Sequence, residues 1–291
     1  MRRFMIFWEK TARLPFWQRL LLKIGLFGGV LFLVLYPRPG LFVKQLENYF
    51  QMDALIQADF PGLEAINREI DLLLEQKEHT PRQEFLTVQS YVYRHIKYAY
   101  DWETWGNIDF WPTAQQVWEL QQEDCDGRAI LAASILRARG FESARLAGNV
   151  RHIWVEVEDY ELMGPDTEKT IRREGDKLVV TLPSLQLLLG STAIYIADFP
   201  AIRHLILFFT AIILLYHPAK NLTHFLGMTI TGLVGFLLLK DWAHQAMESE
   251  AISLNGNFWA GNGLMLFAIG FALWSSRIHA KAMSEIYPST R

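Results

Sequence analysis

Four apolar runs restrict the fold of this chain more than any other sequence feature. They cover residues 20–36, 201–216, 222–239 and 258–274. A helix needs about 20 mostly apolar residues to cross the hydrocarbon core of a bilayer, and each run comes close to that length with its flanks. No Asp or Glu falls inside the runs, whereas a transport pathway normally needs polar groups within the membrane. The sequence therefore predicts four membrane-spanning helices and gives little support for a transporter.

The polar region between the first two runs predicts a separate domain. We place the N-terminus and the first span in residues 1–40, this domain in residues 41–199, and three spans with a tail in residues 200–291. No Ala-x-Ala cleavage site follows the first run, which favours an uncleaved anchor over a signal peptide. Hydrophobic residues make up only 51% of the chain, because the polar domain offsets the spans.

Lys and Arg are unevenly distributed among the predicted loops. Five of them precede the first run, Lys220 lies in the short loop after residue 216, and the C-terminal tail carries three more. The loop at 241–257 has three acidic residues and no Lys or Arg. Since positively charged loops stay in the cytoplasm, we expect both termini inside and the 41–199 domain outside. These features predict a multi-pass protein of the cytoplasmic membrane, with the lipid bilayer as a partner and a domain that faces the exterior, or the periplasm where the cell has two membranes.

Cys125, the only cysteine of the chain, is predicted to begin a helix. Asp124 can cap that helix, and the apolar run 130–136 ends in basic residues and Gly140. The positive N-terminal end of a helix dipole favours a thiolate over a thiol. This position is therefore a candidate for a reactive cysteine.

Two further segments can bring catalytic side chains to Cys125. Residues 152–158 alternate in polarity, which predicts a strand that begins at His152. A third piece, 160–163, leads toward Asp166. An imidazole can take the proton of a thiol, and a carboxylate can fix the tautomer of the imidazole and stabilise its charged form. Such a Cys-His-Asp triad would form an acyl-thioester intermediate.

The sequence around these residues resembles the transglutaminase-like superfamily, a branch of the papain-like cysteine enzymes. The matching blocks are Asp-Cys-Asp-Gly-Arg-Ala at 124–129, His-Ile-Trp-Val-Glu-Val at 152–157 and Pro-Asp-Thr at 165–167. The resemblance implies an α+β, papain-like domain of helices and an antiparallel sheet, inserted between the first span and the other three. It also implies that Cys125 is the nucleophile, His152 the base and Asp166 the orienting acid.

Two positions depart from the family pattern. Glu123 stands where the family usually has Gly, and Asp166 is followed by Thr167 rather than Pro. The second departure leaves Asp159 as the alternative acid of the triad.

Calcium is the one cofactor that the resemblance raises. Some relatives bind calcium through acids beside the cysteine, and Asp124 and Asp126 hold such positions. Helix capping and favourable interaction with the helix dipole explain both acids without a metal, and we favour that explanation. The sequence indicates no other cofactor. The net charge is −3, without a dense basic patch in the polar domain, which argues against nucleic acid as a partner.

The resemblance implies acyl transfer on the amides of a peptide or protein substrate. With water as the acceptor, the chain would be a hydrolase, namely a cysteine protease or amidase. With an amine as the acceptor, it would be a transglutaminase. Hydrolysis is somewhat favoured for a bacterial membrane-bound relative. The alternative is a catalytically degenerate domain that binds peptides or scaffolds an envelope complex, and the reactivity of Cys125 distinguishes the two.

Other segments of the polar domain give local predictions. Capping boxes that begin at Thr80 and at Thr113 predict two helix starts, the first helix running to about residue 98. Aromatic residues crowd the loop 101–112, which packs as a hydrophobic plug, lines a substrate cleft, or donates a hydrogen bond to an oxyanion. The β-like stretch 178–182 predicts a hairpin at the edge of the sheet that holds the strand at 143–149.

Overall fold

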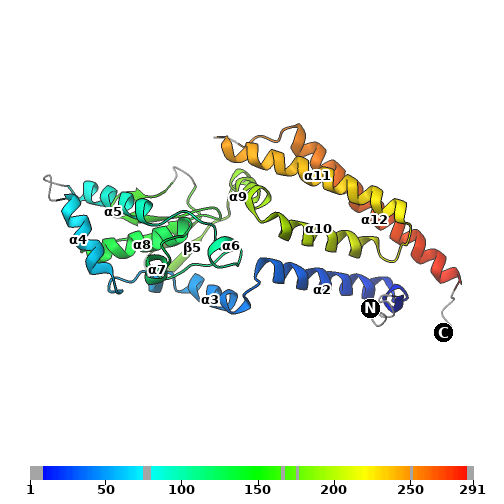
Figure 1. Cartoon of the computed structure of the whole chain (residues 1–291), viewed down its shortest axis with the longest axis horizontal. Helices are drawn as coiled ribbons and strands as arrows, with labels where there is room; N and C mark the ends of the chain where they lie inside the picture. The colour runs from blue at the N-terminus through cyan, green and yellow to red at the C-terminus, as the bar shows by residue number, and fades with distance from the viewer. Residues whose placement is uncertain (1–8, 75–79, 165–167, 175–176, 250–251, 287–291) are drawn as a thin grey trace. The chain divides into compact units, whose positions relative to one another are not determined.

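The computed structural model describes residues 9–74, 80–164, 168–174, 177–249 and 252–286 (Figure 1). The chain divides into two compact units. The membrane unit consists of the described residues of Met1–Leu35 and Thr192–Arg291, and the polar unit consists of those of Tyr36–Ser191. The structure is mostly helical with one small antiparallel sheet, which confirms the predicted α+β class accompanied by membrane helices.

Three helices of the membrane unit are long and apolar enough to cross a bilayer. They are α2 (Phe16–Leu35), α11 (Leu222–Glu248) and α12 (Gly256–Ile286), and they contain three of the four predicted runs. Helices α11 and α12 lie side by side (Figure 1). Gly235 and Gly261 permit this contact, because a Cβ atom at either glycine would lie 2.9 Å from the carbonyl oxygen of the other.

The remaining predicted span differs in the structure. Helix α10 (Ala201–Tyr216) has 16 residues, about 24 Å of helix against a hydrocarbon core of roughly 30 Å. It follows α9 (Leu185–Asp198) with a bend of 101°, and Pro200 at the bend lacks the N–H that would continue α9. Residues 201–216 therefore fall short as a span of their own, and the bent pair α9–α10 makes a fourth span only when both helices are counted together.

The polar unit begins with a series of helices. They are α3 (Pro39–Phe50), the 3-10 helix η1 (Met52–Leu55), α4 (Leu63–Leu74), α5 (Pro81–His95), α6 (Asp101–Thr104), α7 (Ala114–Leu120) and α8 (Cys125–Ala138). The capping boxes at Thr80 and Thr113 start α5 and α7, as predicted. Helix α5 ends before residue 98, because the chain becomes extended there and Lys97 forms a parallel β-bridge with Gln122.

Five strands form one antiparallel sheet in the order β3-β2-β1-β4-β5. Their bounds are β1 (Arg145–Gly148), β2 (Ile153–Val157), β3 (Tyr160–Leu162), β4 (Ile171–Glu174) and β5 (Lys177–Val180). The predicted strands are present, and the hairpin β4–β5 lies at the edge of the sheet, as expected. Strand β2 is buried along its whole length, because it pairs on both sides and α8 packs against it.

The core of the polar unit surrounds α8. Ten of the 14 residues of this helix are buried, so it contacts neighbours on all sides rather than along one stripe. Val155 and Val157 of β2 join the same core. The packing fixes the position of the first residue of α8, and that residue is Cys125.

Candidate functional site

Cys125 is the first residue of α8, as predicted. Asp124 is the N-cap, and its side chain accepts a hydrogen bond of 3.2 Å from the backbone N–H of Asp126. The cap confirms the predicted role of Asp124 and holds its carboxylate next to the thiol. Arg137 lies in the last turn, and Gly140 follows the helix with a φ of 94°, so the predicted stop signals are also present.

His152 directly precedes β2 and is positioned by Asn149. The Asn149 Oδ1 atom accepts hydrogen bonds from the backbone N–H groups of Arg151, at 2.8 Å, and His152, at 3.0 Å. The Asn149 backbone N–H donates to the carbonyl of His152. Sequence reasoning missed this residue, although an Asn between two strands is a known signal for a turn that bonds its own backbone.

The start of β2 brings Cys125 and His152 into one region. Helix α8 packs against β2, and the backbone N–H of Ile153 acts to lower the pKa of the Cys125 thiol, so the thiol lies near the residue that follows the histidine. Both Cys125 and His152 are half-buried. Within the described ranges, no hydrogen bond joins the thiol to the imidazole. The fold therefore places the two groups as neighbours without a direct contact.

A backbone carbonyl fixes the tautomer of His152. Its Nε2 atom lies 2.7 Å from the carbonyl oxygen of Met163, at the end of β3. Because a carbonyl only accepts, Nε2 carries the proton, and the neutral ring keeps a lone pair on Nδ1. That lone pair is what a base for the Cys125 thiol requires.

The expected acid of the triad, Asp166, lies outside the described residues. Among the described residues, the backbone carbonyl of Met163 fixes the tautomer of His152, which is part of the role expected of Asp166. His152 and Asp159 lie beyond opposite ends of β2, and the rise of the strand separates them by about 20 Å. Asp159 therefore cannot pair with the imidazole and is ruled out as the alternative acid. Among the described acids, Asp124 interacts electrostatically with His152.

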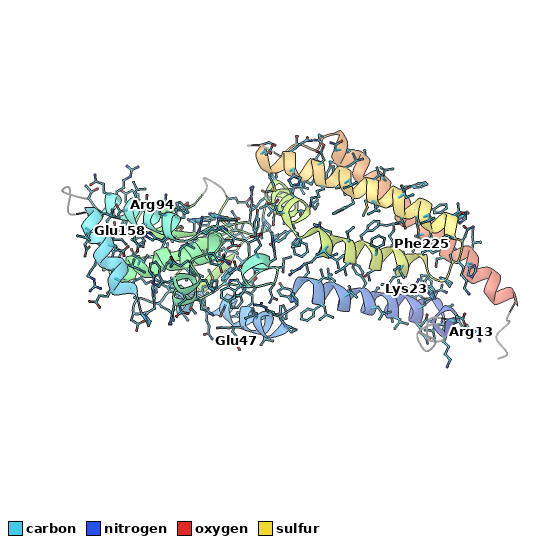
Figure 2. The ribbon with its side chains drawn as sticks, in the orientation of Figure 1. Arg13, Lys23, Glu47, Arg94, Glu158 and Phe225 are labelled. Atoms are coloured by element: carbon cyan, nitrogen blue, oxygen red, sulfur yellow. The ribbon has the colours of Figure 1, made fainter. Side chains whose placement is uncertain are left out.

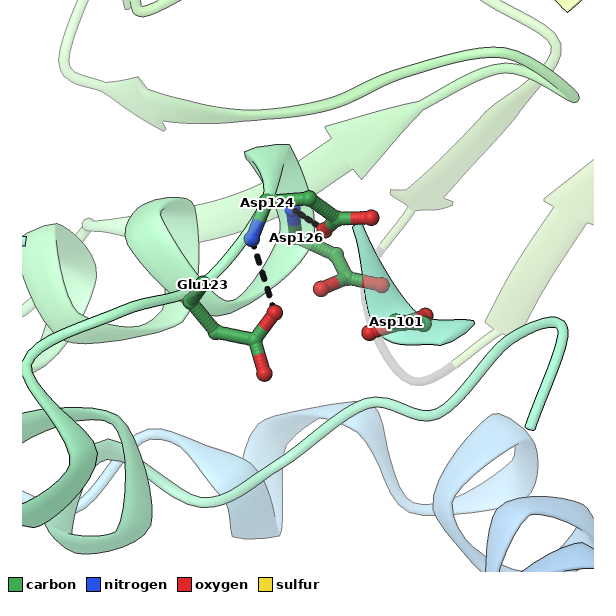
Figure 3. A group of neighbouring side chains, drawn as sticks. All are labelled: Asp101, Glu123, Asp124 and Asp126. Carbon is green, nitrogen blue, oxygen red and sulfur yellow. Dashed lines mark hydrogen bonds between the residues drawn. The ribbon is translucent and has the colours of Figure 1, made fainter. Parts of the chain in front are cut away.

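Four carboxylates gather around the start of α8 (Figure 3). Asp101, Glu123, Asp124 and Asp126 each offer an oxygen, and these oxygens all lie within 4.8 Å of one another. Three of the four side chains are buried, and Asp124 is half-buried. In the described part of the chain, no Lys or Arg forms an ion pair with any of them. Repulsion in a poorly solvated site therefore disfavours full ionisation of this carboxylate cluster.

Glu123, the residue in place of the usual Gly, is bonded within the cluster. Its carboxylate accepts hydrogen bonds from the indole N–H of Trp105 and from the backbone N–H of Asp124, the latter at 2.7 Å. Burial and the nearby Asp124 raise the pKa of Glu123 to about 8. Gly127 leaves room for this side chain, because a Cβ atom there would lie 2.1 Å from the Glu123 Cγ. The departure from the family pattern thus adds a fourth acid and depends on a glycine one turn later.

The cluster also changes the expected state of the thiol. Burial, and then the negative charge of Asp124, hold the pKa of Cys125 well above its ordinary value. Burial lowers the pKa of His152, although the Met163 carbonyl and Asp124 act in the opposite direction. The helix dipole alone predicted a thiolate. In the folded protein, burial and the charge of Asp124 oppose ionisation of the thiol. Cys125 is therefore a neutral thiol and His152 a neutral imidazole at neutral pH.

The four carboxylates fit a hard divalent cation. The Oδ2 atom of Asp101 accepts a hydrogen bond of 2.7 Å from the backbone N–H of Phe110, whereas its Oδ1 atom is buried without any hydrogen-bond partner. A buried carboxylate oxygen without a partner is costly, and Ca²⁺ binds oxygen ligands of this kind. Sequence reasoning named Asp124 and Asp126 as candidates for calcium. It missed Asp101, which reaches the cluster only through the fold, and it noted Glu123 only as a departure from the family pattern.

The aromatic loop packs against this region. Phe110 and Trp111 are buried, and Trp111 contacts the ring of Tyr49 edge-on, which confirms the hydrophobic plug for these two residues. The indole N–H of Trp105 is donated to Glu123, so it is already used and does not serve as a free donor to an oxyanion.

No protein-family model, no curated protein and no solved structure matches this chain. The site is defined by its own geometry: a thiol at a helix N-terminus, a histidine at the start of the adjoining strand, and a buried carboxylate cluster beside them.

Proposed function

We propose that the chain is a membrane-anchored, transglutaminase-like cysteine enzyme that transfers the acyl group of a peptide or protein amide. The observation that supports this most is the packing of α8, which begins at Cys125, against β2, which begins directly after His152. The bond from Nε2 of His152 to Met163 adds to it, because it leaves Nδ1 able to accept the thiol proton. A papain-like arrangement of α8 and the sheet is part of the proposal.

The reaction follows from these positions. Nδ1 of His152 takes the proton from Sγ of Cys125 as the sulfur attacks the amide carbonyl carbon. The same proton passes to the departing amine nitrogen, and the acyl group stays on sulfur as a thioester. Water or a second amine then attacks the thioester, giving hydrolysis or transamidation. Since catalytic hydrogen bonds are often long before substrate binds, the contact between Cys125 and His152 forms in this scheme on substrate binding. Asp166 is the proposed orienting acid of His152.

Calcium is the proposed cofactor of this site. Asp101, Glu123, Asp124 and Asp126 would hold it, and when bound it supplies positive charge among carboxylates that otherwise repel one another. The protein's own part is to present the oxygens: α6 contributes Asp101, and the start of α8 with its preceding residues contributes the other three.

A second candidate function is peptide binding or scaffolding of an envelope complex by a degenerate domain. The raised pKa of Cys125 and the lowered pKa of His152 favour it, as does the lack of a thiol–imidazole hydrogen bond in the described ranges. Both candidates place the protein in the bacterial inner membrane, with the polar unit facing the periplasm or exterior.

Alkylation of Cys125 by an electrophilic thiol reagent separates the two candidates. Because the chain has one cysteine, no other thiol contributes to the rate. For an enzyme we expect His152→Ala to slow alkylation near neutral pH by roughly tenfold or more, whereas the control His95→Ala, on α5, leaves the rate unchanged. Asp166→Asn should reduce turnover more than alkylation. Equal alkylation rates in the wild-type protein and His152→Ala would favour the binding domain.

A further inference from the structure

A large, half-open cavity lies in the membrane unit, between α2, α10 and α12. Its volume is about 1060 Å³, at the upper limit of the roughly 300–1,000 Å³ of ordinary ligand pockets. Most of its wall is apolar side chains, among them Phe27, Leu31, Leu214 and Leu273. The polar side chains in the wall are Arg19, Lys23, Ser276 and Arg277, and none of the lining residues is acidic. The cavity therefore combines an apolar wall with three positive charges.

The positive charges lie at one end of the cavity. Arg19, Lys23, Phe27 and Leu31 are spaced four residues apart on α2, so they share one helix face, with the cations toward the N-terminus and the apolar residues after them. On α12, Arg277 follows Leu273 toward the C-terminal end. One end of the cavity is thus basic and the other apolar.

Hydrogen bonds hold the basic end together. Lys23, labelled in Figure 2, donates from Nζ to the carbonyl oxygen of His217 at 2.7 Å. Ser276 Oγ donates to the same oxygen at 2.7 Å. These bonds join α2, the end of α10 and α12 at one point. Lys23 keeps two further N–H donors for a ligand, and Arg277 is exposed at the mouth.

The length of the cavity wall matches one leaflet of a bilayer. From Arg19 to Leu31 the helix rises about 18 Å, and half of a typical hydrocarbon core is about 15 Å. A lipid lying along α2 would place its headgroup beside the three cations and its acyl chains against the apolar wall. A zwitterionic lipid also brings a phosphate, but its own ammonium cancels that charge and adds a positive group beside the three cations, so an anionic lipid is favoured.

We propose that this cavity binds an anionic phospholipid from the leaflet on the side of the chain termini. Arg19, Lys23 and Arg277 contact the headgroup phosphate, and the apolar wall contacts the acyl chains. The lipid fills the space between α2 and the α10–α12 pair and links α2 to the rest of the membrane unit. The proposal is independent of the chemistry at Cys125.

The test compares lipids bound to the full-length protein in a neutral detergent. Dioleoyl-phosphatidylglycerol should raise the melting temperature and remain bound in native mass spectrometry. Dioleoyl-phosphatidylcholine should do both more weakly, because it has no net negative charge, and inorganic phosphate should do neither. In Arg19→Gln with Arg277→Gln, binding of phosphatidylglycerol should weaken about thirtyfold, from the loss of two attractive charges. The matched control, Lys10→Gln with Lys220→Gln, removes two charges outside the cavity wall and should bind like the wild-type protein.

A second variant tests the apolar part of the site. Gly28 lines the cavity, and no atom lies within 4 Å of a Cβ built there, so Gly28→Leu can occupy the cavity without removing a charge. It should retain less phosphatidylglycerol while its melting temperature without lipid stays near that of the wild-type protein. Equal binding of the two lipids by the wild-type protein, or undiminished phosphatidylglycerol binding by both the double variant and Gly28→Leu, would overturn the proposal.

Discussion

Asp101 is a buried carboxylate that faces three others, and its protonation is linked to stability. Burial, and then the charges of Asp124 and Glu123, raise the pKa of Asp101 well above its ordinary value in the folded protein. When the pKa of an acid is higher in the folded than in the unfolded protein, the protonated acid stabilises the fold. This contribution to the free energy of unfolding is complete below the unfolded pKa of about 3.9 and is lost as pH rises toward the folded pKa.

We therefore expect the melting temperature of the protein in a chelator to fall as pH rises from about 4, the pKa of an unfolded carboxyl, toward about 8, the pKa of the neighbouring Glu123. Asp101→Asn should stabilise the protein at the upper end of this range by about 1–3 kcal/mol, because the amide removes a charge and places an N–H where Oδ1 has no partner. Differential scanning fluorimetry in detergent measures the shift. Calcium should raise the melting temperature of the wild-type protein and have little effect on Asp101→Asn.

The control for this prediction is Asp59→Asn, which makes the same chemical change at an exposed carboxylate. It should leave both the pH dependence and the calcium response intact. If Asp101→Asn melts below the wild-type protein at every pH, the carboxylate cluster is not electrostatically stressed as described.

Gly127 and Glu123 form a pair whose coupling is measurable. An alanine Cβ at residue 127 would lie 2.1 Å from the Glu123 Cγ, so Gly127→Ala should destabilise the protein by about 1–3 kcal/mol. In a Glu123→Gly background the obstacle is gone, and the higher helix propensity of alanine should make the same change neutral or stabilising by up to about 1 kcal/mol. A double-mutant cycle of unfolding free energies measures this coupling. Equal losses in both backgrounds would show that the two side chains do not compete for space.

At the scale of elements, the turn between β1 and β2 determines where His152 lies. Asn149→Ala removes the acceptor for the N–H groups of Arg151 and His152 and the donor to the Glu168 carbonyl. We expect it to cost about 1–3 kcal/mol of stability and to reduce the effect of His152 on the alkylation rate of Cys125. Asn149→Asp keeps the acceptor and loses only the donor, so its alkylation rate should stay closer to that of the wild-type protein. Identical rates in the two variants would mean that the turn does not position the imidazole.

The elements show which features local sequence could predict. Helix α8 was predictable from its cap, its apolar run and its glycine stop, and β2 from its alternation, because those signals lie within the element itself. The pairing of Cys125 with His152 was suggested by their residue types at the starts of a helix and a strand, and the resemblance strengthened it, because no local pattern fixes how two elements pack. The role of Asp101 was not predictable, since it begins the four-residue helix α6 and joins the cluster through contacts distant in sequence.

Local pattern also failed for the membrane helix α10. Its hydropathy identified an apolar helix, but its 16 residues become a crossing only together with α9. The bend at Pro200 shows that hydropathy identifies apolar helices without fixing how many residues one crossing uses.

At the scale of the whole molecule, contacts within the membrane unit determine how often the chain crosses the bilayer. The carbonyl oxygen of His217, after α10, accepts hydrogen bonds from Lys23, in the first half of α2, and from Ser276, in the second half of α12. The start of α2 and the end of α12 therefore lie at the same end of this unit. With α2, α11 and α12 as the candidate spans, the chain returns to that end only if α9–α10 also crosses. We therefore expect four crossings, with the start of α2 and the end of α12 on the same side of the membrane.

Reporter fusions test this topology together with the charge rule. In the topology that the charge rule predicts, the positive N-terminus, Lys220 and the positive tail all lie in the cytoplasm, and the polar unit lies outside. We expect a fusion at residue 291 to be active with a cytoplasmic reporter such as green fluorescent protein, and a fusion at residue 167 to be active only with a reporter that folds outside, such as alkaline phosphatase. A fluorescent fusion at residue 167 would contradict the orientation. Termini on opposite sides would show that α9–α10 does not cross, and the shared bond at His217 would then have to be absent in the bilayer.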